Sequence, residues 1–165
     1  MSRRTLVRGL FAVVVAVLAG YFLLPDSPER RVLRTLETLA QSLRTAFGED
    51  HAERRERIAT IFRRSTTPNV TLVAPELGTV EGIDELVGLA ASAVGVDLSF
   101  EPSGVEVTDR SARARLLVHL SFRIPGEEIR QKRTASVVLR RAGDDFLVER
   151  VEVSLPSHEE PEARP

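Results

Sequence analysis

The stretch SARARLLVHLSFRI, residues 111–124, carries the clearest secondary-structure signal in the chain. Apolar and polar side chains alternate along it, and only Leu117 breaks the alternation. A period of two over this length predicts a strand of an antiparallel sheet that is buried on one face. The apolar face comprises Leu116, Val118, Leu120, Phe122 and Ile124, and the opposite face comprises Arg113, Arg115, His119, Ser121 and Arg123.

Strands of the same kind flank this segment on both sides. Residues 96–107 alternate with the same period, and Pro102-Ser103-Gly104 should bend that strand. The turn signal Pro125-Gly126 leads into a returning strand over residues 130–141, whose apolar positions share one face. The pattern therefore predicts two consecutive β-hairpins.

The last strand, up to Leu155, changes phase along its length. Phe146 and Val148 share one phase, whereas Val151 and Val153 share the other. A phase change within a strand predicts a bulge, and therefore a curved sheet. The inward residues of the whole sheet are so uniformly apolar that we expect them to pack solidly against the helices.

Three helices should cover the apolar face of this sheet. They are predicted over residues 29–47, 50–64 and 83–94, with a short strand over 69–74 and a tight connection over 78–82. The third helix is apolar on most of its circumference, so it should lie between the sheet and the other helices.

Both of the first two helices begin with recognisable capping residues. Ser27 is a good N-cap when followed by Pro28, and Asp50 with Glu53 resembles a capping box. Gly48 should follow the end of the first helix. The charged residues from Glu53 to Arg57 are interpreted as a solvated helix face.

Composition excludes several classes of function. The 165 residues carry a formal net charge of −1 and include no cysteine. A nearly neutral chain is not typical of nucleic-acid binding, and a chain without cysteine has no disulfide framework, thiolate metal site or cysteine nucleophile. The glycines do not have the spacing of a phosphate-binding loop, and we predict neither a cofactor nor a metal site.

Residues 1–25 form a segment distinct from the rest. Three arginines precede an uncharged apolar run over residues 9–24. At about 1.5 Å per residue, this run is short for a membrane-spanning helix and long for the apolar part of a cleaved signal. Because no small-residue cleavage pattern follows the run, we favour an uncleaved signal anchor over a cleaved signal or a buried helix.

The division of the chain follows from this anchor. The arginines that precede the apolar run predict an N-terminus in the cytoplasm and a domain outside it, at the inner membrane of a bacterium. Residues 26–156 are long enough to form one domain with its own core. Residues 157–165 are acidic and proline-rich, and we predict a disordered tail.

The order of the predicted elements points to a known fold. Its most specific part is Asn69-Val70-Thr71-Leu72, then Pro75-Glu76-Leu77-Gly78, then Gly82-Ile83-Asp84-Glu85-Leu86. This part resembles the NTF2-like superfamily, including its SnoaL-like branch, and the resemblance covers about residues 29–156. It implies an α+β cone in which a curved antiparallel sheet packs on three helices, often around an internal pocket. In this chain one transmembrane helix would precede the cone.

The resemblance implies two classes of function. The enzymes of the superfamily resemble ketosteroid isomerases, dehydratases and polyketide cyclases, with Asp, His, Tyr or Arg inside the cone. Here the domain has no Tyr, and the apolar face of residues 111–124 has no ionisable group, so we assign no catalytic residue. We favour a membrane-anchored binding or assembly module. The alternative is a SnoaL-like small-molecule binder or isomerase- or cyclase-type enzyme, which requires a sizeable pocket with convergent polar groups.

Two candidate sites follow. Glu76 and Asp84 are possible pocket carboxylates, although Asp84 equally suits the first turn of a helix. The outward face of residues 111–124 is a possible interface for a homodimer or an unknown protein partner. The residues of that face are Arg115, Leu117, His119 and Arg123.

Two features of that outward face have competing interpretations. His119 has arginines rather than carboxylates beside it on its strand, which favours a place on an outer surface over catalysis or metal binding. A row of arginines is interpreted as a solvated sheet face, with an anion- or lipid-binding surface as the alternative. The row comprises Arg113, Arg115, Arg123, Arg133, Arg140 and Arg141.

Overall fold

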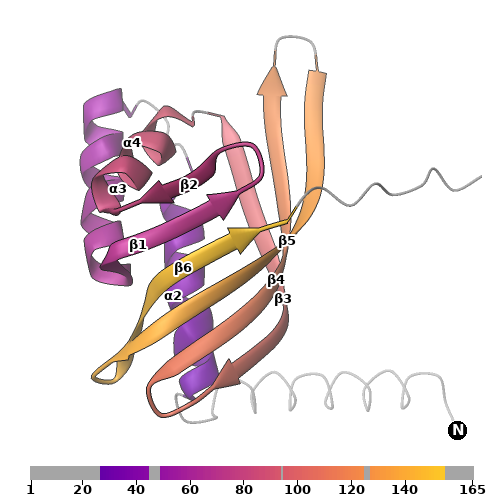
Figure 1. Cartoon of the computed structure of the whole chain (residues 1–165). Coiled ribbons are helices and arrows are strands. Elements are labelled where there is room, and N and C mark those ends of the chain that lie inside the picture. Colours follow the sequence, from indigo (N-terminus) through magenta and orange to yellow (C-terminus); the bar gives the residue numbers. More distant parts are fainter. Residues whose placement is uncertain (1–26, 45–48, 94, 125–126, 155–165) are drawn as a thin grey trace, which may run out of the picture.

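A curved sheet wraps around a layer of helices in the computed structural model (Figure 1). The structure describes residues 27–44, 49–93, 95–124 and 127–154, with side chains for all of these except 122–124 and 127–129. The helices are α2 (Pro28–Ser42), α3 (His51–Ser65) and α4 (Ile83–Ser92). The strands are β1 (Thr66–Ala74), β2 (Gly78–Glu81), β3 (Val96–Val107), β4 (Ser111–Ile124), β5 (Glu127–Ala142) and β6 (Asp145–Val153). The α+β class and the curved sheet on three helices are confirmed.

The six strands form one sheet in the order β2-β1-β6-β5-β4-β3. Strands β3 to β6 pair antiparallel, as predicted, but β1 pairs parallel with β6, so the sheet is mixed and the predicted antiparallel pairing holds only for β2 with β1 and for β3 to β6. Strand β1 follows directly after α3. It pairs with the edge of β6 that faces away from β5 and runs in the same direction as β6. The tight connection predicted over residues 78–82 was also wrong, because it contains β2, which pairs with β1. Positive φ angles of 70° at Gly78 and 86° at Gly82 turn the chain on both sides of this strand.

Helix capping agrees with the sequence. The Ser27 Oγ accepts a hydrogen bond of 3.3 Å from the Arg30 N–H. At α3, the Glu53 N–H donates to Asp50 Oδ1 at 2.8 Å and the Asp50 N–H donates to Glu53 Oε2 at 3.4 Å. Both predicted caps are therefore confirmed. Helix α2 ends at Ser42, earlier than predicted, and the predicted C-terminal residues Phe47 and Gly48 lie outside the described residues.

Register shifts interrupt three of the strand pairs, and two of these shifts fall where the sequence predicted a bend or bulge. The β5–β6 register shifts between Val138 and Leu139, where β6 changes phase, and this confirms the predicted bulge. The β3–β4 register shifts between Pro102 and Gly104, where the sequence predicted a bend. Bulges increase local twist and bend the strand that carries them. Both therefore help the sheet to curve around the helices.

The core is densely filled at one end of the cone. Five side chains, contributed by α2, β4, β5 and β6, are at most 3% exposed there: Val32, Ala112, Ala114, Leu139 and Phe146. Helix α2 is also bonded to the sheet at this end, because Arg31 Nη1 donates to the Asp144 carbonyl at 2.7 Å and the Thr35 hydroxyl donates to the Phe146 carbonyl at 3.2 Å. We call these five residues the packed end.

The predicted anchor, residues 1–25, and the predicted tail, residues 157–165, lie outside the described residues. Among the helices that the structure describes, none combines the length and the apolar character needed to cross a membrane.

Candidate ligand cavity

A cavity of about 480 Å³ lies inside the cone, at the opposite end from the packed core. This volume is within the range of about 300–1,000 Å³ that is typical of small-molecule sites. The C-terminal half of α2, helices α3 and α4, and the inner face of the sheet all contribute to its wall. The expectation of a solidly packed interior was therefore wrong at this end.

Small side chains on facing elements explain why this end is hollow. Alanines from α2, α4 and the sheet face the cavity: Ala40, Ala74, Ala90, Ala93 and Ala135. Between them are larger residues that remain partly exposed, namely Leu39, Leu72, Leu98, Phe100 and Leu120. We call these five larger residues the hollow end. A short side chain leaves space that its rigid neighbours do not close.

The cavity wall is almost wholly apolar. All but five of its residues are apolar, and the exceptions are Arg54, Thr66, Thr71, Glu76 and Arg133. The charged side chains are therefore two arginines and one glutamate. Such a wall favours the hydrophobic part of a ligand and restricts polar recognition to a few points.

Glu76 and Arg133 form an ion pair at this wall. Arg133 Nη2 lies 2.7 Å from Glu76 Oε1, and Arg133 Nη1 donates to Glu76 Oε2 at 2.8 Å. The pair is thus bidentate, which is the strong geometry for a guanidinium and a carboxylate. Gln131 Oε1 accepts two further hydrogen bonds from Arg133, at 2.8 and 3.3 Å. The guanidinium is therefore held by acceptors from two segments of the chain, which are its own strand β5 and the turn between β1 and β2.

The two partners differ in exposure. The Arg133 side chain is 11% exposed, whereas the Glu76 side chain is 49% exposed. Hydrogen bonding from Arg133 lowers the pKa of Glu76, and a backbone hydrogen bond lowers it further. The same contact with Glu76 raises the pKa of Arg133. The pair is therefore fully ionised at neutral pH, and Glu76 is a weaker base than an ordinary glutamate.

The inward position of Arg133 corrects the sequence interpretation, which placed it on the solvated face. Arg133 is in phase with Ala135, Val137 and Leu139, all of which are buried. Its partner across the β4–β5 ladder is Val118, which lines the cavity. The alternation that assigns Ala135, Val137 and Leu139 to the inward face of β5 also includes Arg133, two residues earlier, and this was the available signal.

Arg54 is the second correction, because the sequence predicted a solvated helix face at Glu53–Arg57. The Arg54 side chain is buried, with 2% exposure, and its Nη2 donates to the carbonyls of Leu43, Ala90 and Ala93 at 2.8, 3.3 and 3.0 Å. These carbonyls lie at the C-terminal ends of α2 and α4, where helices lack internal donors and carry partial negative charge. Arg54 precedes the buried Ile58 by four residues, and this helical spacing was the available signal.

Arg57 supports the same helix end. It donates to the Ser42 carbonyl at 2.7 Å and to the Arg44 carbonyl at 3.0 Å, and it pairs with Glu49 at 2.6 Å. Together with Arg54 it binds three successive carbonyls at the end of α2. Helix α3 therefore holds the end of α2 that borders the cavity.

The two predicted pocket carboxylates lie in different places. Glu76 lines the cavity, whereas Asp84 is exposed in the first turn of α4. Asp84 borders a shallow surface hollow together with Glu85 and Arg63. A ligand role for either carboxylate stays a prediction.

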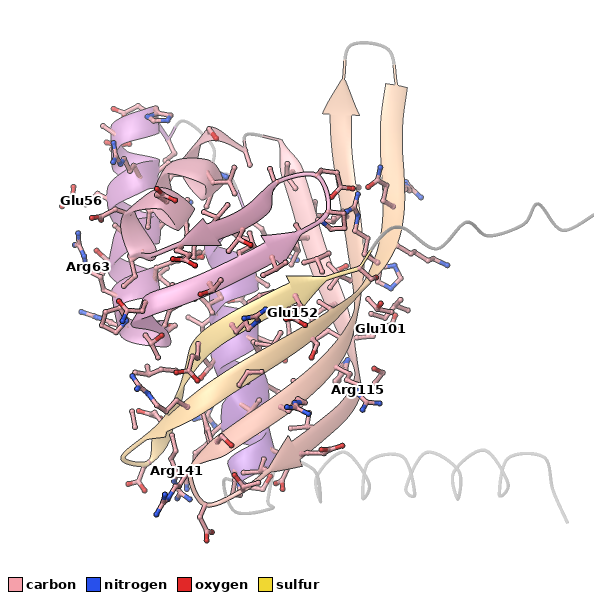
Figure 2. The ribbon with its side chains drawn as sticks, in the orientation of Figure 1. Glu56, Arg63, Glu101, Arg115, Arg141 and Glu152 are labelled. Carbon is pink, nitrogen blue, oxygen red and sulfur yellow. The ribbon has the colours of Figure 1, made fainter. Side chains whose placement is uncertain are left out.

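The predicted interface residues lie away from the cavity on β4. Figure 2 shows Arg115 projecting from the sheet on the side away from α2 and α3, with Glu101 beside it. Leu117 is partly buried, and the His119 side chain is 33% exposed with its Nε2 3.6 Å from Glu101 Oε1. The side chain of Arg123 lies outside the described residues. Within the described part of the chain, no group of three or more His, Asp or Glu side chains could hold a metal ion.

The arrangement of these elements matches several solved structures. An NTF2-like superfamily protein from Salmonella enterica serovar Typhimurium superposes with a TM-score of 0.62 at 13% identity, covering 84% of this chain and 97% of that one. The chain has the NTF2-like fold. The CaMKII hub of S. rosetta gives a TM-score of 0.64 at 14% identity, over 79% and 98% of the two chains. A candidate ketosteroid isomerase from Shewanella frigidimarina gives 0.57 at 14% identity, over 78% and 96%.

Sequence comparison adds no narrower assignment to this fold. No protein-family model matches the chain, and no curated protein matches it either. Because the identities to the solved structures are low, the likeness establishes the NTF2-like fold and leaves the activity to be argued from the cavity.

Proposed function

We propose that this chain is a binding module that holds a hydrophobic small molecule inside its cone and does not transform it. The apolar cavity of about 480 Å³ carries this proposal. Filling such a cavity removes apolar surface of both ligand and protein from water, which stabilises the complex at about 25 cal/mol per Å². The presence of the cavity favours a ligand-binding module over an assembly module whose interior only packs.

The polar groups of the wall favour binding over catalysis. A general base works best with a pKa near the working pH, whereas the pKa of Glu76 is lowered by Arg133. Arg54 is occupied by three helix-end carbonyls. Neither histidine nor tyrosine is among the residues of the wall that the structure describes.

Identification of a co-purified ligand tests the proposal directly. The purified full-length chain is expected to release a hydrophobic compound on denaturation, seen by mass spectrometry, and to bind added hydrophobic compounds with a rise in melting temperature. The variant Ala93→Trp should occupy part of the cavity and weaken both effects. Turnover of small hydrophobic substrates that is lost in Glu76→Gln would replace this proposal with the isomerase- or cyclase-type alternative.

An assembly role through the outward face of the sheet is a second candidate. The structural neighbours include the CaMKII hub of S. rosetta and the association domain of C. elegans CaMKII, and this likeness supports homo-oligomerisation as the second candidate. Leu117 and the partly buried Val138 would form the apolar centre of the contact. Sedimentation velocity should show a dimer that Leu117→Glu converts to a monomer, while the control Arg55→Glu, at an exposed position of α3, leaves it intact.

We further propose that residues 1–25 anchor this domain to the inner membrane of a bacterium, with the domain outside the cytoplasm. The charge-free run over residues 9–24 after three arginines supports this placement. Helix α2, which follows the proposed anchor in sequence, begins at the packed end, and the cavity lies at the opposite end of the domain. Carbonate extraction should leave the chain in membranes, and external protease should digest the domain in spheroplasts. Release into the soluble fraction would exclude the anchor.

A further inference from the structure

We infer that the cavity selects an amphiphile with an anionic headgroup, which Arg133 binds in place of Glu76. This inference rests on the proposed binding function and adds the chemical class of the ligand. It depends on three observations, namely the charge of the wall, the geometry of Arg133, and the unequal burial of the two partners.

The charges of the wall favour a negative ligand group. Its ionised side chains are Arg54, Arg133 and Glu76, which leaves an excess of one positive charge. Arg54 is directed at the carbonyls of Leu43, Ala90 and Ala93. Arg133 is therefore the cation that a ligand group can reach, and a cationic ligand would be repelled by both arginines.

The geometry of Arg133 already matches a carboxylate. Its two terminal nitrogens bind the two oxygens of Glu76 at 2.7 and 2.8 Å. A ligand carboxylate in the same position would meet the same two donors, while Gln131 keeps the guanidinium in place. Glu76 thus occupies the position that the headgroup of a ligand would take.

The unequal exposure of the two side chains indicates that Glu76, and not Arg133, can move out of the ion pair. Arg133 is nearly buried on a central strand, so its charge requires an anionic partner at all times. Glu76 belongs to the turn between β1 and β2, and half of its side chain faces solvent. If Glu76 turns outward, it becomes hydrated at small cost, and the incoming headgroup restores the ion pair with Arg133.

The residue beside Glu76 fits the same ligand. Leu77 is 49% exposed, the one large hydrophobic residue exposed to this degree in the described part of the chain, and it also lines the cavity. An exposed leucine at an apolar opening offers contact to an aliphatic chain. The contacts to the headgroup and to the aliphatic chain of the ligand are therefore adjacent in the turn between β1 and β2.

The test compares an acid with an alcohol of equal chain length. Binding of dodecanoate and dodecanol to the full-length chain would be measured by calorimetry, in the same buffer and carrier for every variant. Wild type should prefer dodecanoate. Arg133→Gln should weaken dodecanoate binding roughly tenfold or more and leave dodecanol binding within about twofold, because only the charged hydrogen bonds are lost. Retained dodecanol binding also shows that the variant is folded.

Glu76→Gln should have the opposite effect on dodecanoate binding. Removing the competing carboxylate should tighten dodecanoate binding several-fold and leave dodecanol binding unchanged. Arg150→Gln is the matched control, because Arg150 pairs with Glu152 at 2.6 Å on the same sheet but does not line the cavity. It should change neither affinity. With carboxyl-labelled dodecanoate, the ¹³C resonance of the bound headgroup should shift in Arg133→Gln.

The possible failures are distinguishable. Equal affinity for acid and alcohol in wild type, with no effect of Arg133→Gln on their ratio, would overturn the headgroup inference and leave the binding function standing. Weaker dodecanoate binding in Glu76→Gln would also overturn it, since Glu76 would then assist the ligand. No binding of either compound to wild type would overturn the inference together with the proposed function.

Discussion

The packed end and the hollow end of the cone are built from the same kinds of residue but differ in density. At the packed end, Leu139 and Phe146 are at most 1% exposed. At the hollow end, Leu98 and Leu120 on the same sheet remain partly exposed and line the cavity. Both ends present alternating apolar side chains to the helices, so hydrophobic patterning alone does not distinguish a solid core from a binding cavity.

Besides the small side chains that line the cavity, the two ends differ in what holds α2. At its N-terminal half, Arg31 and Thr35 bond to carbonyls of the β5–β6 hairpin and draw the helix onto the sheet. At its C-terminal end, Arg54 and Arg57 of α3 bind its carbonyls instead. A helix end held by another helix need not collapse onto the sheet. Arg54 and Arg57 therefore help to keep the cavity open.

The largest expected loss of stability comes from a substitution at the packed end. Phe146→Ala removes a 1%-exposed ring and should lower the free energy of unfolding by about 3–5 kcal/mol. Leu120→Ala at the hollow end should cost less, about 1–3 kcal/mol, because its side chain already borders empty space. Urea denaturation measures both. Equal losses would mean that the two ends are equally well packed.

The next effect concerns the support of the cavity by Arg54. Arg54→Met should lower the free energy of unfolding by about 2–3 kcal/mol, because carbonyls of Leu43, Ala90 and Ala93 lose a buried donor. The control is Arg55→Met on the exposed face of the same helix, which should stay within about 0.5 kcal/mol. Stability of Arg54→Met equal to that of the control would contradict the role of Arg54 at the helix ends.

Replacing one alanine by leucine at each end tests how much free space the two ends contain. Ala114→Leu at the packed end should destabilise by about 1–3 kcal/mol, because no space receives the larger side chain. Ala135→Leu faces the cavity and should cost less than about 1 kcal/mol while weakening ligand binding. Thermal denaturation and calorimetric titration give the two quantities. A severe loss of stability in Ala135→Leu would show that the cavity cannot accept the added atoms.

The smallest expected effect concerns pH and the Glu76–Arg133 pair. Because the pKa of folded Glu76 is below its ordinary value, the pair stabilises the fold above that ordinary value. This contribution should decline as pH falls below the ordinary value and disappear once pH passes the lowered pKa. In urea denaturation, the stability difference between wild type and Glu76→Gln should therefore stay constant from pH 7 down to the ordinary pKa of glutamate, about 4.3, and shrink as pH falls further. A difference that stays constant below that value as well would mean that the pair does not contribute to stability.

The sequence predicted the elements well where local chemistry decides them. The caps at Ser27 and Asp50 are local hydrogen bonds between residues three apart. The bulge in β6 was visible as a phase change between Val148 and Val151. The β4 segment matches its predicted bounds, Ser111–Ile124, because its alternation is nearly unbroken.

The site was less predictable because its residues come from distant parts of the chain. Glu76 and Arg133 are 57 residues apart in sequence and meet only when the β1–β2 turn is placed beside β5. The helix-end contacts of Arg54 span 36 residues to Ala90 and 39 to Ala93. In both cases the spacing within one element could have indicated the inner face, but the sequence interpretation placed both arginines in solvent, and no local signal identified their partners.

The sequence by itself thus determined the order of the helices and of every strand except β2, the helix caps, the curvature of the sheet and the apolar character of most of the cone interior. These properties depend on side-chain periodicity and on contacts between near neighbours. Only the tertiary structure decided that one end of this interior is packed and the other hollow, and that Arg133 meets Glu76 at the cavity. The volume left between elements depends on how helices and sheet are held relative to one another, which alternation along a single strand does not encode.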